Sequence, residues 1–501
     1  MHGYRPSRWP HVKEIKNPNF LELSRMHCCD LCKLRKAPDF TNFDDSFLAS
    51  WVSKFPNSPE ESQICTFCWG LLQNGGRIVE AVQLALREAD YADIFSCLLS
   101  VQFPAILLFR QYIEGITSIG DSGKDVRSVV RGLIQRSTIS EQYSDKMPKL
   151  FVDVAFHYTE SLVEVPKELV NAVNEMQRHK AGKQWHKSMQ AVNISDVQHF
   201  IERTKGDISL VYASLYGKSE LPDITEMRSV LESRFLNGTV VTPTVSVSLR
   251  RETVYLVGNY VKDTRDFGQS QWDAHETSVS ELICPEICQL FKSPIDKCLF
   301  SASGREDMDV RMLGCGRSFV IQLGDAKSLE PLINEESALK GFKLDTGDVK
   351  VTGGLRWVDK GVMDWLHWST EQHLKVYRCI VWTEAVLPSQ ECLDDIHVKK
   401  TGLKILQKTP LRVLHRRTEQ TREKTMYSLQ GERLNDHFAI FTLHASAGAY
   451  IKEFVHGDFG RTSPCFSDVV FGKHVRCDIL QLDVLEVIQE EEEQYVPIWD
   501  R

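Results

Sequence analysis

Long apolar runs are missing from this chain of 501 residues. No stretch approaches the roughly 18 uninterrupted apolar residues that a membrane helix requires, and residues 1–16 contain no apolar segment of the kind that directs secretion. We therefore expect a soluble, intracellular protein with no membrane partner. A compact basic localisation run is also missing, so the expected compartment is the nucleus, the cytoplasm or both.

The glycine-rich loops that bind nucleotides are missing as well. Gly314 and Gly316 in "LGCGRSF" lack the third glycine of a dinucleotide fingerprint, and there is no P-loop. The "HGDFG" at residues 456–460 contains a kinase-like DFG, but neither an HRD motif nor a glycine-rich loop accompanies it. The sequence thus predicts no nucleotide cofactor and no phosphotransfer.

The composition is that of an ordinary globular protein, with 42% hydrophobic and 26% charged residues. The length indicates roughly two to four domains. A net charge of −8 argues against a nucleic-acid binder, but basic residues gather at residues 399–424 and four acids at Glu490–Glu493. Because a local patch matters more than the total, the basic stretch is a candidate RNA contact; a plain solvated face is the alternative.

Two cysteine pairs have the spacing of metal ligands. Cys29 and Cys32 form one CxxC pair, and Cys65 and Cys68 form another. In a reducing compartment such thiols persist, and two knuckles of this kind can close a four-sulfur shell around a structural zinc ion. The alternatives are buried thiols or a redox pair, and Cys28 could take the place of Cys29.

Hydrophobic periodicity indicates two further regions. Residues 75–89 have the four-residue spacing of an amphipathic helix, and alternating strands are expected at residues 95–103 and 150–156. A second domain is expected from about residue 240, opening with a β-hairpin whose turn lies at residues 250–252. Later strands include "RSFVIQL", "KVYRCIVW" and "HFAIFTLH", and Cys284 and Cys288 are expected to share a buried helix face.

The stretch "SGREDMDVR" at residues 303–311 would by itself be a charged surface turn. It resembles the motif of pseudouridine synthases in which Gly-Arg-x-Asp presents the catalytic aspartate, and Asp307 matches that aspartate. "KVYRCIVW" is similar to their second motif, matching Tyr377, and "SAGAYIKEFVHGDFGRT" to their third, matching Tyr450 and Lys452. Together with "QKTPLRVLHRR" and the CxxC pairs, the chain resembles the archaeal and eukaryotic tRNA pseudouridine synthases that carry an RNA-binding THUMP domain.

The resemblance implies an α+β protein of three parts. Residues 1–75 would be a zinc-binding segment, residues 76–225 a THUMP-like α/β RNA-binding module, and residues 240–501 a catalytic domain built on a mixed sheet. The implied activity is isomerisation of uridine 55 in the TΨC arm of tRNA, with uridine 54 a second target in some members. It requires no catalytic cofactor, and we expect a monomer. The alternative is a non-catalytic RNA-binding protein that acts in RNA processing.

Each matched residue can be given a role. Ionised Asp307 would either attack the ribose as a nucleophile or remove a ribose proton to give a glycal. Lys452 would keep Asp307 ionised, while Tyr377 stacks on the extruded uracil and Tyr450 forms a second wall of the pocket.

Glu306 and Asp309 are expected to be supporting groups, with Asp309 bonded to Arg305 or Arg311. The expected RNA contacts are Arg305, Arg412, His415, Arg416, Arg417 and Arg461. The chain departs from the family at Gly258-Asn259-Tyr260, where relatives have Gly-Arg-Tyr.

Overall fold

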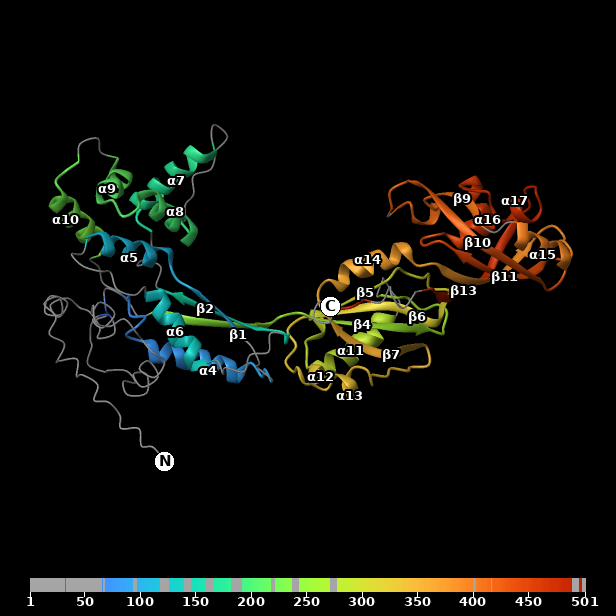
Figure 1. The fold of residues 1–501 in the computed structure, drawn as a ribbon, viewed down its shortest axis with the longest axis horizontal. Helices are drawn as coiled ribbons and strands as arrows, with labels where there is room; N and C mark the ends of the chain where they lie inside the picture. Colours follow the sequence, from blue (N-terminus) through green and yellow to red (C-terminus); the bar gives the residue numbers. More distant parts are fainter. Residues whose placement is uncertain are drawn as a thin grey trace, which may run out of the picture. The chain divides into compact units, whose positions relative to one another are not determined.

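The protein forms two compact units in a computed structural model (Figure 1). Unit 1 comprises Met1–Asp90 and Ile94–Arg250, and unit 2 comprises Tyr91–Asp93 and Arg251–Arg501. The structure describes residues 32, 65, 68–92, 97–117, 126–138, 146–158, 165–181, 192–217, 221–236, 243–270, 277–399, 402–415, 417–488 and 495–497. Within these ranges, no helix is both long and apolar enough to cross a bilayer.

Unit 1 contains a three-stranded sheet in the order β1-β2-β3. The predicted strands are confirmed as β1 (Cys97–Gln102) and β2 (Leu150–His157), which pair in parallel, and buried residues alternate with more exposed ones along both. The predicted amphipathic helix is α4 (Gly75–Glu88), which buries Ile78 and Val82. Further helices among the described residues are α5 (Ala105–Thr117), α6 (Val126–Thr138), α7 (Lys167–Ala181), α8 (Ile194–Thr204), α9 (Ile208–Tyr216) and α10 (Ile224–Phe235).

The predicted hairpin at residues 245–257 is wrong, although both of its strands exist. β3 (Thr244–Arg251) joins the sheet of unit 1, whereas β4 (Val254–Lys262) joins the sheet of unit 2. Burial explains the difference, because β3 alternates between exposed and half-buried residues while β4 is buried along most of its length. In the structure the main part of unit 2 begins at Arg251.

Unit 2 is built on a mixed ten-stranded sheet, as predicted, in the order β12-β9-β10-β11-β8-β13-β6-β4-β7 with β5 paired to β6. The strands are β5 (Cys298–Ala302), β6 (Val310–Leu323), β7 (Val349–Val358), β8 (Lys375–Thr383), β9 (Leu403–Lys408), β10 (Thr421–Arg433), β11 (Phe438–Ala445), β12 (Thr462–Ser463) and β13 (Cys477–Val487). The α-helices are α11 (Val279–Phe291), α12 (Glu330–Ile333), α13 (Glu335–Ala338), α14 (Val362–Gln372), α15 (Gln390–Lys399), α16 (Ile451–His456) and α17 (Phe466–Val470). The 3-10 helices are η4 (Ile295–Lys297), η5 (Leu411–Val413) and η6 (Gly457–Gly460).

One strand joins the two halves of this sheet. β13 runs antiparallel to β8 on one side and parallel to β6 on the other, where Leu482 lies opposite Val310. The segment just before β6 contains the "GRED" stretch, so β13 ties that segment to the half of the sheet that contains β8 to β11. Cys284 and Cys288 are both buried on α11, which confirms their predicted packing role.

Aromatic packing holds the helices α16 and α17 against the sheet. The rings of Phe441 on β11 and Phe466 on α17 meet edge to face with their centroids 4.7 Å apart, and Phe454 on α16 contacts Phe466 from another side. Opposite Phe441 lies Gly431, where an added Cβ would come within 2.6 Å of the Phe441 ring. The phenylalanine therefore fills the space that the glycine leaves open.

We predict that Phe441→Ala lowers the free energy of unfolding by about 3–5 kcal/mol, because removing a buried ring loses its transfer free energy and creates a cavity. Phe441 is 2% exposed. The matched control is Leu434→Ala in the turn between β10 and β11, where the side chain is 51% exposed, and it should change the value by less than about 0.5 kcal/mol. Denaturant titration measures both. Equal losses in the two variants would contradict this account of the core.

Candidate active site

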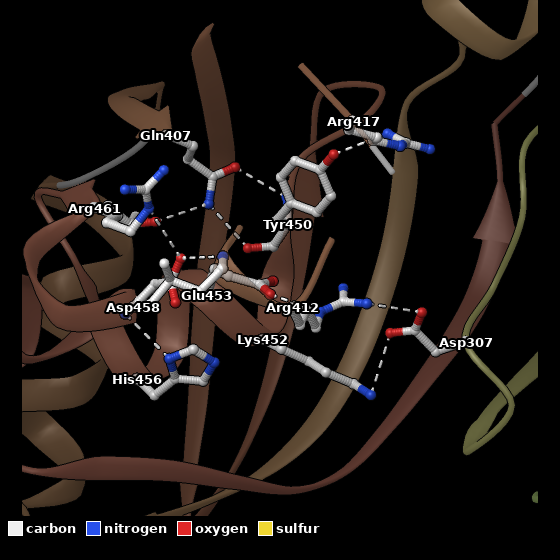
Figure 2. Close-up of polar contacts among 12 residues, drawn as sticks. Asp307, Gln407, Arg412, Arg417, Tyr450, Lys452, Glu453, His456, Asp458 and Arg461 are labelled. Atoms are coloured by element: carbon white, nitrogen blue, oxygen red, sulfur yellow. Dashed lines mark hydrogen bonds and ion pairs between the residues drawn. The ribbon is translucent and has the colours of Figure 1, made fainter. Parts of the chain in front are cut away.

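Three segments of unit 2 that are far apart in sequence meet at Asp307 (Figure 2). Asp307 lies between β5 and β6, Arg412 lies in η5 after β9, and Lys452 lies in α16 after β11. Arg412 donates from Nη1 to Oδ1 of Asp307 at 3.1 Å, and the Nζ of Lys452 lies 3.3 Å from Oδ2. The cation that was expected beside Asp307 is therefore present, and a second one accompanies it.

Glu453 holds the Arg412 side chain in place. The Nε of Arg412 donates to Oε1 of Glu453 at 2.7 Å, and the Glu453 side chain is only 3% exposed. The sequence placed Arg412 among RNA contacts and assigned no role to Glu453. Because an arginine has its donors in a rigid fork, one guanidinium can bind both carboxylates at once. Arg412 thus connects the buried acid of α16 to the half-buried Asp307.

The pKa of Asp307 results from opposing effects. Burial raises the pKa, but the charges of Arg412 and Lys452 and their hydrogen bonds outweigh burial, so the pKa lies below the ordinary value of 3.8. The Asp307 side chain is 35% exposed, so the group is partly open to solvent. At neutral pH the site presents an ionised carboxylate flanked by two cations.

The backbone of the Asp307 loop is held by a buried lysine. The Nζ of Lys262 donates to the carbonyl oxygens of Phe267, Met308 and Asp307, at 2.7, 3.1 and 3.4 Å. Lys262 is fully buried, and burial lowers its pKa although Glu306 and Asp309 act in the opposite direction. Nothing in the sequence pattern indicated this lysine, because it ends an ordinary strand.

The two acids beside Asp307 are supporting groups, as expected, but one has a different partner. Glu306 accepts from the Nε of Arg317 at 2.8 Å and from the hydroxyl of Tyr260 at 2.8 Å, all in buried surroundings. Asp309 accepts from Lys452 at 2.7 and 2.8 Å. The expected bond from Asp309 to Arg305 or Arg311 was wrong for Arg311, whose guanidinium binds Asp483 on β13 (3.0 and 2.6 Å). Asp309 instead orients the cation that serves Asp307.

The two matched tyrosines differ in accessibility. Tyr377 on β8 is 8% exposed, and burial raises its pKa to about 12. Tyr450 is less buried, and the Gln407 amide donates to its carbonyl and accepts from its N–H, both at 2.9 Å (Figure 2). Its hydroxyl accepts from Nη1 of Arg417 at 2.9 Å. Their roles as walls of a uracil pocket stay predictions.

The remaining predicted RNA contacts lie in different surroundings. Arg305, His415 and Arg417 are exposed, and Arg416 lies outside the described residues. Arg461 is 18% exposed and donates to the Thr409 carbonyl and to Glu419 at 2.9 and 3.0 Å. Its guanidinium therefore already has partners within the fold.

The "HGDFG" segment has an uncommon backbone. Gly457, Asp458, Phe459 and Gly460 all have positive φ angles, with φ 44° at Asp458 and 57° at Phe459. Each non-glycine residue in this region costs roughly 1–2 kcal/mol, and such residues normally occur singly. The sequence excluded a kinase role for this segment and matched it to the end of the third motif, but did not indicate this backbone conformation.

The predicted metal ligands converge in unit 1. Cys32, Cys65 and Cys68 are each at most 2% exposed, and their sulfur atoms all lie within 4.8 Å of one another. Cys29, the predicted fourth ligand, lies outside the described residues. In a tetrahedral zinc site with bonds of about 2.3 Å, neighbouring sulfurs lie roughly 3.8 Å apart. The three thiols therefore fit a metal of this kind.

Sequence comparison relates the chain to a known family. A family model described as "Pus10, C-terminal" matches residues 255–488. The "tRNA pseudouridine synthase Pus10" of Mus musculus is 30% identical over 442 residues, covering 86% of this chain and 79% of the mouse protein. The protein of the same name from Pyrococcus furiosus is 30% identical over 57% of this chain and 68% of its own length, and the human one 37% identical over 47% and 44%.

Structure comparison adds little. A crystal structure of a Cbf5-Nop10-Gar1 complex matches with a TM-score of 0.27 and 13% identity, covering 46% of this chain and 48% of that one. This likeness is too low to support a conclusion about the site.

We predict that Arg412→Met raises the pKa of Asp307, because it removes a charge that lowers the pKa and leaves the burial that raises it. Carbodiimide labelling of protonated carboxyl groups between pH 3 and 6, read by peptide mass spectrometry, follows this residue. In the wild type, Asp307 should be labelled only at pH values below the ordinary pKa of an aspartate. In Arg412→Met, labelling of Asp307 should extend to higher pH. Asp345, which is 63% exposed, is the internal control and should label alike in both proteins. Identical Asp307 curves would show that Arg412 does not set its ionisation.

Proposed function

This chain belongs to the Pus10 family of pseudouridine synthases, and we propose that it isomerises uridine 55 of tRNA, with uridine 54 as a second target, using Asp307 as its catalytic carboxylate. The observation that carries the assignment of Asp307 is its position between Arg412 and Lys452. This arrangement keeps the carboxylate ionised while its side chain remains partly exposed.

The reaction defines what the site must do. The bond from nitrogen 1 of uracil to the ribose breaks, the ring turns, and a new bond forms from carbon 5 of the same ring to the ribose. Carbon 5 then loses its hydrogen as a proton, and nitrogen 1 gains a proton. Atoms and oxidation state are unchanged, so a correctly placed carboxylate can carry the chemistry. Asp307 either attacks carbon 1 of the ribose or takes the proton from carbon 2, and both routes begin from the ionised form.

The neighbouring residues assist in distinct ways. Arg412 and Lys452 lower the cost of the negative charge before the reaction. Lys262 fixes the carbonyls of the Asp307 loop, so that the carboxylate has a defined position relative to the ribose. Tyr377 and Tyr450 would hold the uracil ring, since a base must leave its stack before an enzyme can reach its glycosidic bond.

Binding of tRNA would use the exposed basic groups around this site. His415, Arg417 and Arg305 are exposed in unit 2, and arginine forks suit phosphate oxygens. Unit 1, with its small sheet and helices, would be the THUMP-like module that contacts the tRNA at a distance from the target base. If both units contact the tRNA, the folded shape of the RNA, and not the local sequence alone, selects the uridine.

A structural zinc ion would complete unit 1. Cys32, Cys65 and Cys68 fit three positions of a tetrahedral shell, and Cys29 is the proposed fourth ligand. Four thiolate ligands would leave no open position for a substrate, so the ion would stabilise the fold and take no part in the reaction.

The function is tested with Asp307→Asn. We expect nearly normal tRNA binding and at least about a hundred-fold loss of pseudouridine formation, since the amide can neither attack nor accept a proton. Base-resolution mapping of pseudouridine gives both the rate and the position. The matched control is Asp309→Asn, which removes a neighbouring partner of Lys452 but leaves Asp307, and it should retain measurable activity. Pseudouridine formed at the wild-type rate by Asp307→Asn would remove Asp307 from its role, and modification elsewhere would correct the target position.

The zinc proposal is tested by elemental analysis of protein purified without chelator. We expect about one zinc per chain, and a lower content together with a lower melting temperature in Cys65→Ser. Cys315→Ser, which alters an exposed cysteine of unit 2, is the control and should change neither value. A zinc content well below one per wild-type chain would show that the clustered thiols have another purpose.

A further inference from the structure

Phe459 is the most exposed large apolar side chain in the described part of the chain, at 94%. It lies at the tip of η6, where its own φ of 57° and the φ of 44° at Asp458 are unfavourable for residues with a Cβ atom. A glycine at position 459 would adopt the same backbone without that cost, and a polar side chain would avoid exposing a ring to water. The fold gains nothing from a phenylalanine here.

This loop is held in place by several contacts. Asp458 is 6% exposed, and its N–H donates to Nδ1 of His456 at 3.1 Å. Its carboxylate accepts from the N–H of Leu411 at 3.3 Å and lies 3.7 Å from the Nε of Arg461 (Figure 2). The exposed ring is therefore presented from a fixed base. Backbone strain that is maintained by surrounding contacts is characteristic of functional segments.

The same contacts connect the loop to the catalytic carboxylate. The residue bonded to Asp458 is Leu411, the next residue is Arg412, and Arg412 binds Asp307. Leu411 is itself 45% exposed. Phe459 thus follows directly after the residue that holds the segment carrying Arg412.

We propose that Phe459 stacks on a nucleobase of the RNA substrate that neighbours the target uridine, an inference that rests on the proposed function. Every nucleobase offers a flat face to an aromatic ring, and such stacking does not depend on sequence. Exposed basic side chains adjoin the segments that hold this loop: Lys408, whose N–H donates to the Arg461 carbonyl, and His415 and Arg417, which follow Arg412 along the chain. An aromatic ring among such groups suits a polyanion with stacked bases better than the apolar groove of a protein.

The test compares four variants at position 459 by steady-state pseudouridine formation on an unmodified tRNA transcript. Phe459→Ala should raise KM by about ten-fold, the effect typical of losing one stacked base, with a much smaller change in kcat. Phe459→Tyr should restore the wild-type KM, because it keeps the ring. Phe459→Leu should resemble the alanine variant, because it keeps apolar surface without a flat face. Phe459→Gly should raise KM like alanine while increasing the melting temperature, since it relieves the left-handed strain.

The control is Leu434→Ala, which removes an exposed apolar side chain from the turn between β10 and β11. This variant should leave KM unchanged. A KM unaltered in Phe459→Ala, full rescue by leucine, or an equal rise in Leu434→Ala would each overturn the stacking proposal. An unaltered KM would also indicate that the ring serves some other partner, such as a protein. These outcomes are separate from failure of the proposed function, which would appear as wild-type protein that forms no pseudouridine or as an active Asp307→Asn.

Discussion

The site depends on one balance, between the burial of the Asp307 carboxylate and the two cations that face it. Burial alone would favour the protonated acid, which can neither attack nor accept a proton. Arg412 and Lys452 reverse that preference, and each is held by a further acid, Glu453 and Asp309 respectively. The charges therefore alternate through the site, so that each of the two cations facing the carboxylate has a second acidic partner before the substrate arrives.

This balance requires the two halves of the large sheet to keep a fixed register. Asp307 precedes β6 in one half, whereas Arg412 and Lys452 follow β9 and β11 in the other. β13 is the common neighbour, and its Asp483 binds both Arg311 (2.6 Å) and Arg265 (2.6 Å). Arg265 also donates to the carbonyl of Asp309 at 2.8 Å. β13 thus helps to fix the same loop that Lys262 holds from inside. This explains why several charged groups that take no part in the reaction lie close to Asp307.

The sequence was informative where function depends on short motifs and uninformative where it depends on distant pairing. Asp307 and Lys452 could be predicted because each lies in a recognisable segment. Arg412 was not predicted as a partner of Asp307, because it lies outside the matched motifs and an arginine in a basic run resembles a phosphate contact. The false hairpin at residues 245–257 has the same origin, because alternation identifies a strand but not the sheet it joins. Lys262 and Glu453 gave no signal, as burial of a charge is decided only by the complete fold.

Two features that reduce the stability of the fold, a strained turn and a set of partly buried charges, are connected through the adjacent residues Leu411 and Arg412. The left-handed turn at Asp458 and Phe459 is tied to the N–H of Leu411, while Arg412 carries the interaction with Asp307. Strain in a loop and desolvation of charges both reduce stability, so a fold selected for stability alone would separate or remove them. Their connection through η5 means that a ligand contacting the Phe459 loop also bears on the segment that orients Arg412. If RNA contacts the Phe459 loop as proposed, that contact acts on η5, the short helix that carries Arg412.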